Sequence, residues 1–153
     1  MKLSRKSDYA LRALLHLAMA NGSRPVPVRE LAEANEIPRK FLEAIMRDLR
    51  ELGLVESVAG KKGGYHLQQA PGDIQIGSLL RHFDGHLEPF EADLEVLPAR
   101  GEDPKIRVQV VLRDIARQVD SLMDQITLDA VLSGEPIDYE ISSRGEFVHG
   151  DGI

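Results

Sequence analysis

The chain has 153 residues, no cysteine, and a formal net charge of −6 at pH 7. Without cysteine it cannot form a disulfide, use a thiolate nucleophile, or bind zinc or an iron–sulfur cluster through thiolates. No apolar run is long enough to span a bilayer and no signal-peptide pattern is present, so we expect a cytoplasmic protein that does not bind membranes.

The charges are distributed unevenly along the chain. Residues 1–65 contain 12 Lys and Arg against 8 Asp and Glu, whereas residues 66–153 contain 7 against 17. A basic amino-terminal part joined to an acidic remainder favours one region for nucleic acid and another for association or sensing.

The spacing of apolar residues predicts three helices in the first third of the chain. They are expected at residues 4–20, 28–35 and 38–52. Apolar residues of the third helix would face inward, and Gly53 follows it where a left-handed cap is expected. The outer face of this helix carries charged side chains: Arg39, Lys40, Glu43, Arg47 and Arg50.

A hairpin is expected next, with strands at residues 54–58 and 65–68 and a turn that contains Lys61 and Lys62. This order of helices and hairpin is that of a winged helix-turn-helix protein, whose third helix would be the recognition helix. We therefore expect a mainly α fold with a small β-hairpin wing, and we assign residues 1–70 as a DNA-binding head.

In the second half of the chain we expect a segment that connects the head to a dimerisation region. A helix at residues 76–83 and a sensor-type loop form the connection, residues 71–104, and two further helices form residues 105–132. A flexible tail is expected at residues 133–153. Because the head is complete without the long helix, a partner subunit is expected to cover the apolar seam of that helix: Val108, Leu112, Ile115, Val119, Leu122 and Ile126.

Five side chains near residue 85 have the composition of a metal site, namely His82, Asp84, His86, Glu88 and Glu91. Because Asp84 and Gly85 break the helix, His82 and His86 need not share a face, and an ordinary polar loop is favoured. The sequence contains no Ser/His/Asp set, phosphate-binding loop or paired buried carboxylates. We therefore expect no catalytic residues and no metal site, and so not an enzyme.

Seven stretches follow one another in a characteristic order: MKLSRKSDYALRAL, IPRKFLE, LRELGLV, GGYHL, IGSLLRHFDG, LRDI and ITL. Together they resemble the Rrf-two (Rrf2) superfamily of bacterial transcription regulators, from residue 2 to about residue 132. The resemblance implies a homodimer in which the long helix crosses to the partner. Its two winged heads would read a palindromic operator in double-stranded DNA.

The resemblance also assigns residues to the DNA interface. Lys6 and Tyr9 lie where the first helix of the family approaches phosphates, and Lys40 and Glu43 lie where its recognition helix meets base edges. Glu43 is expected either to pair with an arginine one turn away or to accept a hydrogen bond from cytosine N4. The expected DNA-binding set is Lys6, Tyr9, Arg39, Lys40, Glu43, Arg47, Lys61 and Lys62.

The wing departs from the family pattern at one position. Many relatives have an arginine where this chain has Ala59, before the first wing glycine. Lys61 and Lys62 follow shortly after and can neutralise phosphate, but they lack the planar fork with which arginine reads a minor groove.

The larger departure is the absence of a cluster site. Iron–sulfur members have three cysteines before the long helix, where this chain has Ala92 and Ala99 near two of them and Ile106 at the third. Gln109 stands at a further ligand position. No cofactor is therefore expected, and we interpret the chain as a naturally cluster-free member. Its effector would be a small molecule or a protein bound at residues 86–104, or regulation would act through expression level alone.

These observations predict a homodimeric DNA-binding transcription regulator, most simply a repressor, that acts without an iron–sulfur cluster. Two other functions stay open. In the first, the head serves as a protein-binding adaptor and does not bind DNA. In the second, residues 82–104 form the sensor of a regulator that responds to a metal or a small molecule.

Overall fold

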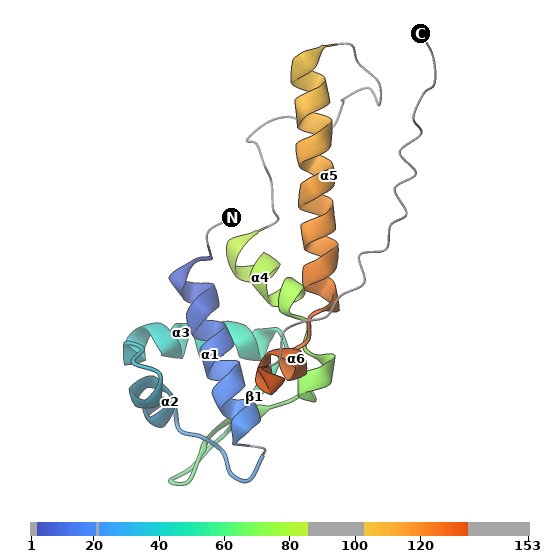
Figure 1. The fold of residues 1–153 in the computed structure, drawn as a ribbon. Helices are drawn as coiled ribbons and strands as arrows, with labels where there is room; N and C mark the ends of the chain where they lie inside the picture. The colour runs from blue at the N-terminus through green and yellow to red at the C-terminus, as the bar shows by residue number, and fades with distance from the viewer. Residues whose placement is uncertain (1–2, 21, 86–102, 135–153) are drawn as a thin grey trace.

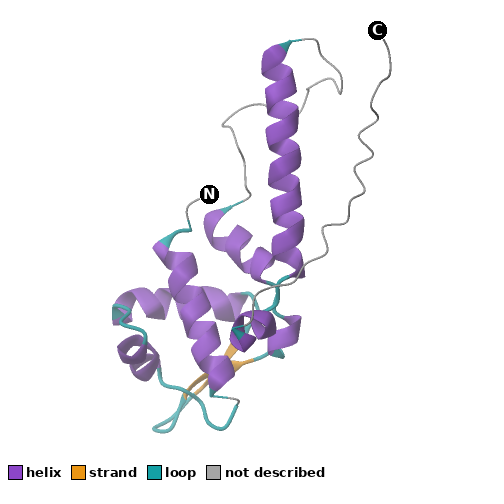
Figure 2. Ribbon diagram, viewed as in Figure 1, coloured by secondary structure: helices purple, strands orange, loops and turns teal. Residues whose placement is uncertain are grey.

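The structure is a computed structural model that describes residues 3–20, 22–85 and 103–134. The described elements are α1 (Arg5–Met19), α2 (Val28–Ala34), α3 (Arg39–Glu51), β1 (Val55–Val58), β2 (Gly64–Leu67), η1 (Pro71–Asp73), α4 (Ile76–Asp84), α5 (Pro104–Gln125) and α6 (Leu128–Ser133). Figure 2 shows a mainly helical protein with one hairpin, so the predicted fold class is confirmed. Most of the predicted loop and tail lies outside the described residues. No helix within the described ranges is long and apolar enough to cross a membrane.

Helices α1 and α3 pack against each other in the head (Figure 1). Ser4 begins α1, because its hydroxyl accepts a hydrogen bond of 3.2 Å from the backbone N–H of Ser7. Helix α3 buries one side at helical spacing and leaves the other side exposed. Its buried residues are Leu42, Ile45, Met46 and Leu49.

Helix α3 ends at the predicted glycine cap. Gly53 has a φ of 69° and donates its N–H to Arg50 O at 3.0 Å. Leu54 N–H donates to Leu49 O, also at 3.0 Å. These two bonds form a Schellman motif, which confirms the prediction made for Gly53.

The turn between α2 and α3 contains a residue in the left-handed region. Glu36 has a φ of 55° and is the only non-glycine residue with a positive φ in the described ranges. Ile37 anchors the turn, because its side chain is buried and its N–H donates to Ala32 O at 2.9 Å. The turn therefore keeps Glu36 in a conformation that an asparagine or glycine would adopt at lower cost.

Strands β1 and β2 pair antiparallel and form the predicted wing, at the end of the molecule away from α5 (Figures 1 and 2). Val55 lies opposite Leu67, and Val58 lies opposite Gly64. Strand β2 therefore begins one residue earlier than predicted and ends before Gln68.

Val26 adds a one-residue bridge to this sheet that was not predicted. Its N–H and C=O both bond to the backbone of Tyr65, at 2.8 Å each. A Cβ at Gly64 would lie 2.6 Å from the nitrogen of Pro27 and closer still to the carbonyl of Val26. Gly64 is therefore required for this close approach.

The carboxyl-terminal end of α5 is fixed to α4. A Cβ at Gly77 would lie 2.9 Å from the nitrogen of Asp124, so the missing side chain lets the two helices meet. Arg81 forms an ion pair with Asp124 at the same contact. Two backbone hydrogen bonds close it: Ile76 N–H to Ile126 O at 2.9 Å and Leu128 N–H to Ile74 O at 2.8 Å.

The apolar seam predicted along α5 divides into two parts. Val119 and Ile126 pack against the core of their own chain, because the contact at Gly77 holds this end of α5 on the head. Val108 and Ile115 are 56% and 51% exposed, and Val111, which the predicted seam did not include, is 57% exposed. The exposed apolar face therefore lies on the amino-terminal part of α5, which rises away from the head in Figure 1.

Candidate nucleic-acid interface

The exposed side of α3 presents two cations around a small residue. Lys40 and Arg47 lie two helical turns apart, opposite the buried side, and Ala44 lies between them. Neither cation pairs with a carboxylate in the described part of the chain. Because alanine is short, a ligand could approach the helix backbone closely between the two positive charges.

Arg39 and Glu43 flank this surface as a pair one turn apart. Arg39 Nε lies 2.9 Å from Glu43 Oε1, and both side chains are exposed. Glu43 was expected either to pair with an arginine or to accept a hydrogen bond from a cytosine. The structure contains the first of these contacts, with Arg39. The hydrogen bond to a cytosine stays a prediction.

An aromatic pair joins α1 to α3 beside the same surface. The ring of Tyr9 meets that of Phe41 edge to face, with centroids 5.7 Å apart, and the Arg12 guanidinium lies 5.7 Å from the Tyr9 centroid. Phe41 is exposed although large and apolar. The sequence interpretation singled out Tyr9 and missed Phe41. The available signal was the position of Phe41 beside, rather than within, the buried helical stripe.

The wing tip carries two further exposed cations. Lys61 and Lys62 are exposed in the turn, which is closed by a hydrogen bond of 2.9 Å from Gly63 N–H to Gly60 O. No described carboxylate pairs with either lysine. The turn therefore presents two lysines that no described carboxylate neutralises.

Lys6, the first predicted phosphate ligand, has a different environment. Its Nζ lies 2.6 Å from Asp48 Oδ2 on α3 and 4.9 Å from the ring centroid of Phe83 on α4. The Lys6 side chain is 40% exposed. The structure therefore places this ammonium within contacts between α1, α3 and α4.

Asp84 is part of a hydrogen-bonded contact rather than a metal site. Its Oδ2 accepts hydrogen bonds from Ser4 N–H at 3.2 Å and from Ser7 Oγ at 2.7 Å. Burial raises the pKa of Asp84, but these hydrogen bonds together outweigh it, so that its pKa lies below the ordinary value. Among the described residues no three His, Asp or Glu side chains are grouped to hold a metal. His86, Glu88 and Glu91 lie outside the described residues.

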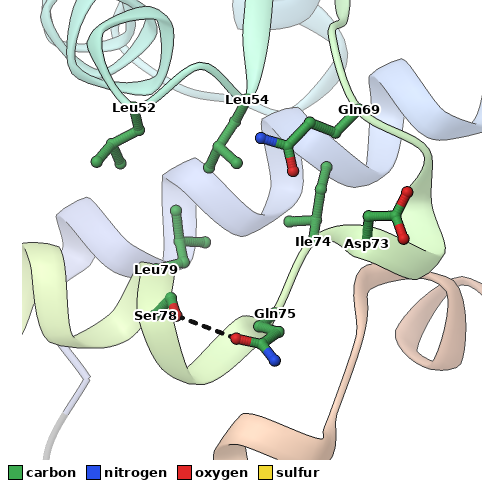
Figure 3. A pocket seen from close by; sticks show the side chains of 8 residues that line it. All are labelled: Leu52, Leu54, Gln69, Asp73, Ile74, Gln75, Ser78 and Leu79. Carbon is green, nitrogen blue, oxygen red and sulfur yellow. Dashed lines mark hydrogen bonds between the residues drawn. The ribbon is translucent and has the colours of Figure 1, made fainter.

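A pocket lies between the end of α3 and the start of α4 (Figure 3). Leucine and isoleucine side chains from both segments face one another across it: Leu52, Leu54, Ile74 and Leu79. Its polar lining residues are Gln69, Asp73, Gln75 and Ser78. Ser78 Oγ donates to Gln75 Oε1 at 3.4 Å, and Gln69 Nε2 donates to Gly53 O at 3.0 Å. The junction between α3 and α4 is therefore incompletely filled.

The family model for Rrf2, described as an iron-dependent transcriptional regulator, matches residues 3–134. The chain belongs to the Rrf2 family. This Rrf2 protein is 32% identical to CymR of Bacillus subtilis over 133 residues, which cover 87% of this chain and 91% of CymR.

Solved structures agree with this assignment. The structure of CymR, the global cysteine regulator of B. subtilis, matches with a TM-score of 0.72 and 29% identity over 89% of this chain and 99% of CymR. IscR of T. potens matches with a TM-score of 0.69 and 28% identity over 88% of each chain. These relatives are transcription regulators, so the prediction of an Rrf2 transcription regulator rather than an enzyme is confirmed.

Proposed function

We propose that this Rrf2 protein represses transcription by binding, as a homodimer, to a palindromic operator in double-stranded DNA. The proposal depends on the positions of the lysines and arginines of the head that have no described carboxylate partner. Most arginines of the described head form ion pairs with carboxylates. Apart from Arg5 at the start of α1, the lysines and arginines of the described head without a described carboxylate partner lie on the exposed side of α3 and at the wing tip: Lys40, Arg47, Arg50, Lys61 and Lys62.

Helix α3 would enter the major groove with Lys40, Ala44 and Arg47 toward the DNA. The wing would lie on the neighbouring backbone, where Lys61 and Lys62 neutralise phosphates. Arg39 and Glu43 would meet the groove edge as a pair, and Tyr9 would approach the backbone from α1. Because these contacts release condensed counterions, affinity should fall steeply as salt rises.

The exposed apolar face of α5 would form the dimer interface. Val108, Val111 and Ile115 are each more than half exposed, and Leu112 lies beside them. Isolated surface apolar residues are ordinary, but a continuous stripe on one projecting helix indicates a partner surface. A two-fold axis along this stripe would place two recognition helices in successive major grooves, about one helical turn apart.

The chain does not fit the cluster that the family description and the iron–sulfur members imply. Its 153 residues contain no cysteine. Ile106, at the last cysteine position, has no donor atom, and Gln109 offers only an amide. We therefore propose regulation by a small molecule or a protein in place of a cluster.

The proposal is tested with DNA selected by the protein itself from a random duplex pool. Fluorescence anisotropy of a labelled selected duplex should show Lys40→Gln and Lys61→Gln binding several-fold more weakly than wild type. Each substitution should also reduce the slope of log K against log salt by about 0.9. Arg117→Gln, on exposed α5, is the matched control and should change neither quantity.

Unchanged affinity in both lysine variants would exclude this surface as the DNA interface. Selection of no sequence at all would favour the adaptor, which would bind a protein through the same head.

A further inference from the structure

Among the head lysines in the predicted DNA-binding set, Lys6 alone has a described carboxylate partner, and that partner lies on another helix. Its Nζ is 2.6 Å from Asp48 Oδ2, and the two side chains are 40% and 27% exposed. The four ion pairs that arginines form within the described head join residues at most six positions apart, and the His66–Glu56 pair joins the two strands of the wing. The Lys6–Asp48 pair instead joins α1 to the recognition helix, so it constrains how the two helices lie relative to each other.

The ammonium of Lys6 has a second partner on a third helix. It lies 4.9 Å from the centroid of the Phe83 ring, and Phe83 packs against the core near the end of α4. A carboxylate and an aromatic face thus hold the same charge. A phosphate would have to compete with both contacts, whereas Lys40 has no described partner to give up.

The end of α4 is itself held in place. Asp84, next to Phe83, accepts hydrogen bonds from Ser4 N–H and from the buried hydroxyl of Ser7. At the other side, Arg81 of α4 pairs with Asp124 of α5. A displacement of α5 or α4 would therefore move the Phe83 ring, and with it the ammonium that holds Asp48.

We propose that Lys6 is a positioning residue: it fixes the recognition helix relative to the end of α4 through Asp48 and Phe83, and does not bind phosphate. The inference rests on the proposed function, because it concerns how α3 is presented to DNA. It predicts that the Lys6 contacts change operator affinity without contributing to the release of counterions from DNA.

The test compares the salt dependence of binding for two lysine variants. Lys6→Gln and Lys40→Gln are titrated against the same labelled duplex, selected by the wild-type protein, at four salt concentrations. For Lys6→Gln we expect roughly 3- to 10-fold weaker binding with an unchanged slope of log K against log salt. For Lys40→Gln the slope should fall by about 0.9, as for any lost phosphate contact.

A neutral substitution provides the second arm. Phe83→Leu removes the aromatic face without changing charge, and should weaken binding in the same way with the same slope. Lys6→Arg should restore most of the affinity, because a guanidinium can meet both partners. Circular dichroism at the titration temperature should show each variant folded, which separates loss of positioning from loss of structure.

Three results would overturn the inference: a slope that falls for Lys6→Gln as it does for Lys40→Gln, unchanged affinity in Lys6→Gln, or unchanged affinity in Phe83→Leu. In each of these cases the wild-type and Lys40→Gln titrations would still support DNA binding. If the wild-type protein bound no duplex, the proposed function would fail and the inference would fail with it.

Discussion

Ser7 Oγ donates a hydrogen bond of 2.7 Å to Asp84 Oδ2, and this bond joins the first turn of α1 to the last residue of α4. Ser7 is the only polar residue in the buried core of the described ranges. A buried hydroxyl is tolerated when its hydrogen bond is made, so the contact specifies where α4 ends on the head. It also accounts for the position of Asp84, which the sequence suggested only as a helix breaker or a metal ligand.

Asp84→Asn should lower the free energy of unfolding by about 1 kcal/mol at pH 7. This is the contribution of hydrogen bonds to a charged group, reduced because Asp84 is partly exposed to solvent. Because the pKa of Asp84 is lowered in the folded state, its ionised form stabilises the fold above the unfolded pKa of about 3.9. That contribution is lost as pH falls through the lower folded pKa. Urea unfolding across pH 7 to 3 should therefore show the two proteins converging below about pH 4. A constant difference across this range would contradict the account.

Gly77→Ala should separate α5 from α4. Its Cβ would lie 2.9 Å from the nitrogen of Asp124, which backbone atoms cannot easily avoid. We expect a loss of about 1–3 kcal/mol in the free energy of unfolding, as for overpacked sites. Gly72→Ala is the matched control, since no atom lies within 4 Å of a Cβ there. Equal effects of the two substitutions in denaturant titrations would contradict the close contact.

Glu36→Asn should stabilise the head by roughly 0.5–1 kcal/mol, because asparagine tolerates the left-handed conformation better than glutamate does. Glu36 has a φ of 55° in the turn before α3. The control, Glu33→Asn within α2, should instead cost about 0.5–1 kcal/mol, because it lowers helix propensity and removes the exposed ion pair with Arg29. Thermal unfolding followed by circular dichroism would show shifts of opposite sign. A lowered midpoint for Glu36→Asn would mean that its side chain makes a contact that offsets the strain.

Ile115→Glu should convert the proposed dimer to a monomer. Ile115 is 51% exposed within the apolar stripe of α5, and a buried carboxylate at a two-fold interface would face its own copy. Arg117→Glu introduces the same side chain on the opposite side of the helix and should leave the dimer intact. Sedimentation velocity at several concentrations distinguishes the two variants. A dimer that survives Ile115→Glu unchanged would place the interface elsewhere.

The sequence was sufficient to predict those features that depend on residues close together along the chain. Apolar spacing located α3 and Gly53 located its end, because helix faces and caps depend on residues within one or two turns. The lysines of the wing were placed for the same reason, since a glycine-rich turn between two short strands has few alternatives.

Contacts between distant segments could not be predicted in this way. A lysine at position 6 has the same local pattern whether it meets water, phosphate or Asp48. Val26 lies between two prolines, and nothing nearby indicates that it bridges to Tyr65. The apolar residues of α5 keep the same alternating spacing of four and three along the whole helix. Their spacing therefore could not show that Val119 packs against its own chain whereas Ile115 is exposed.

A hydroxyl-radical footprint of the wild-type protein on a duplex it selects tests the central claim most directly, namely that two heads of one dimer read a palindrome. The account predicts two protected patches related by two-fold symmetry, on one side of the duplex and about one helical turn apart. A single protected patch, or protection without symmetry, would contradict it.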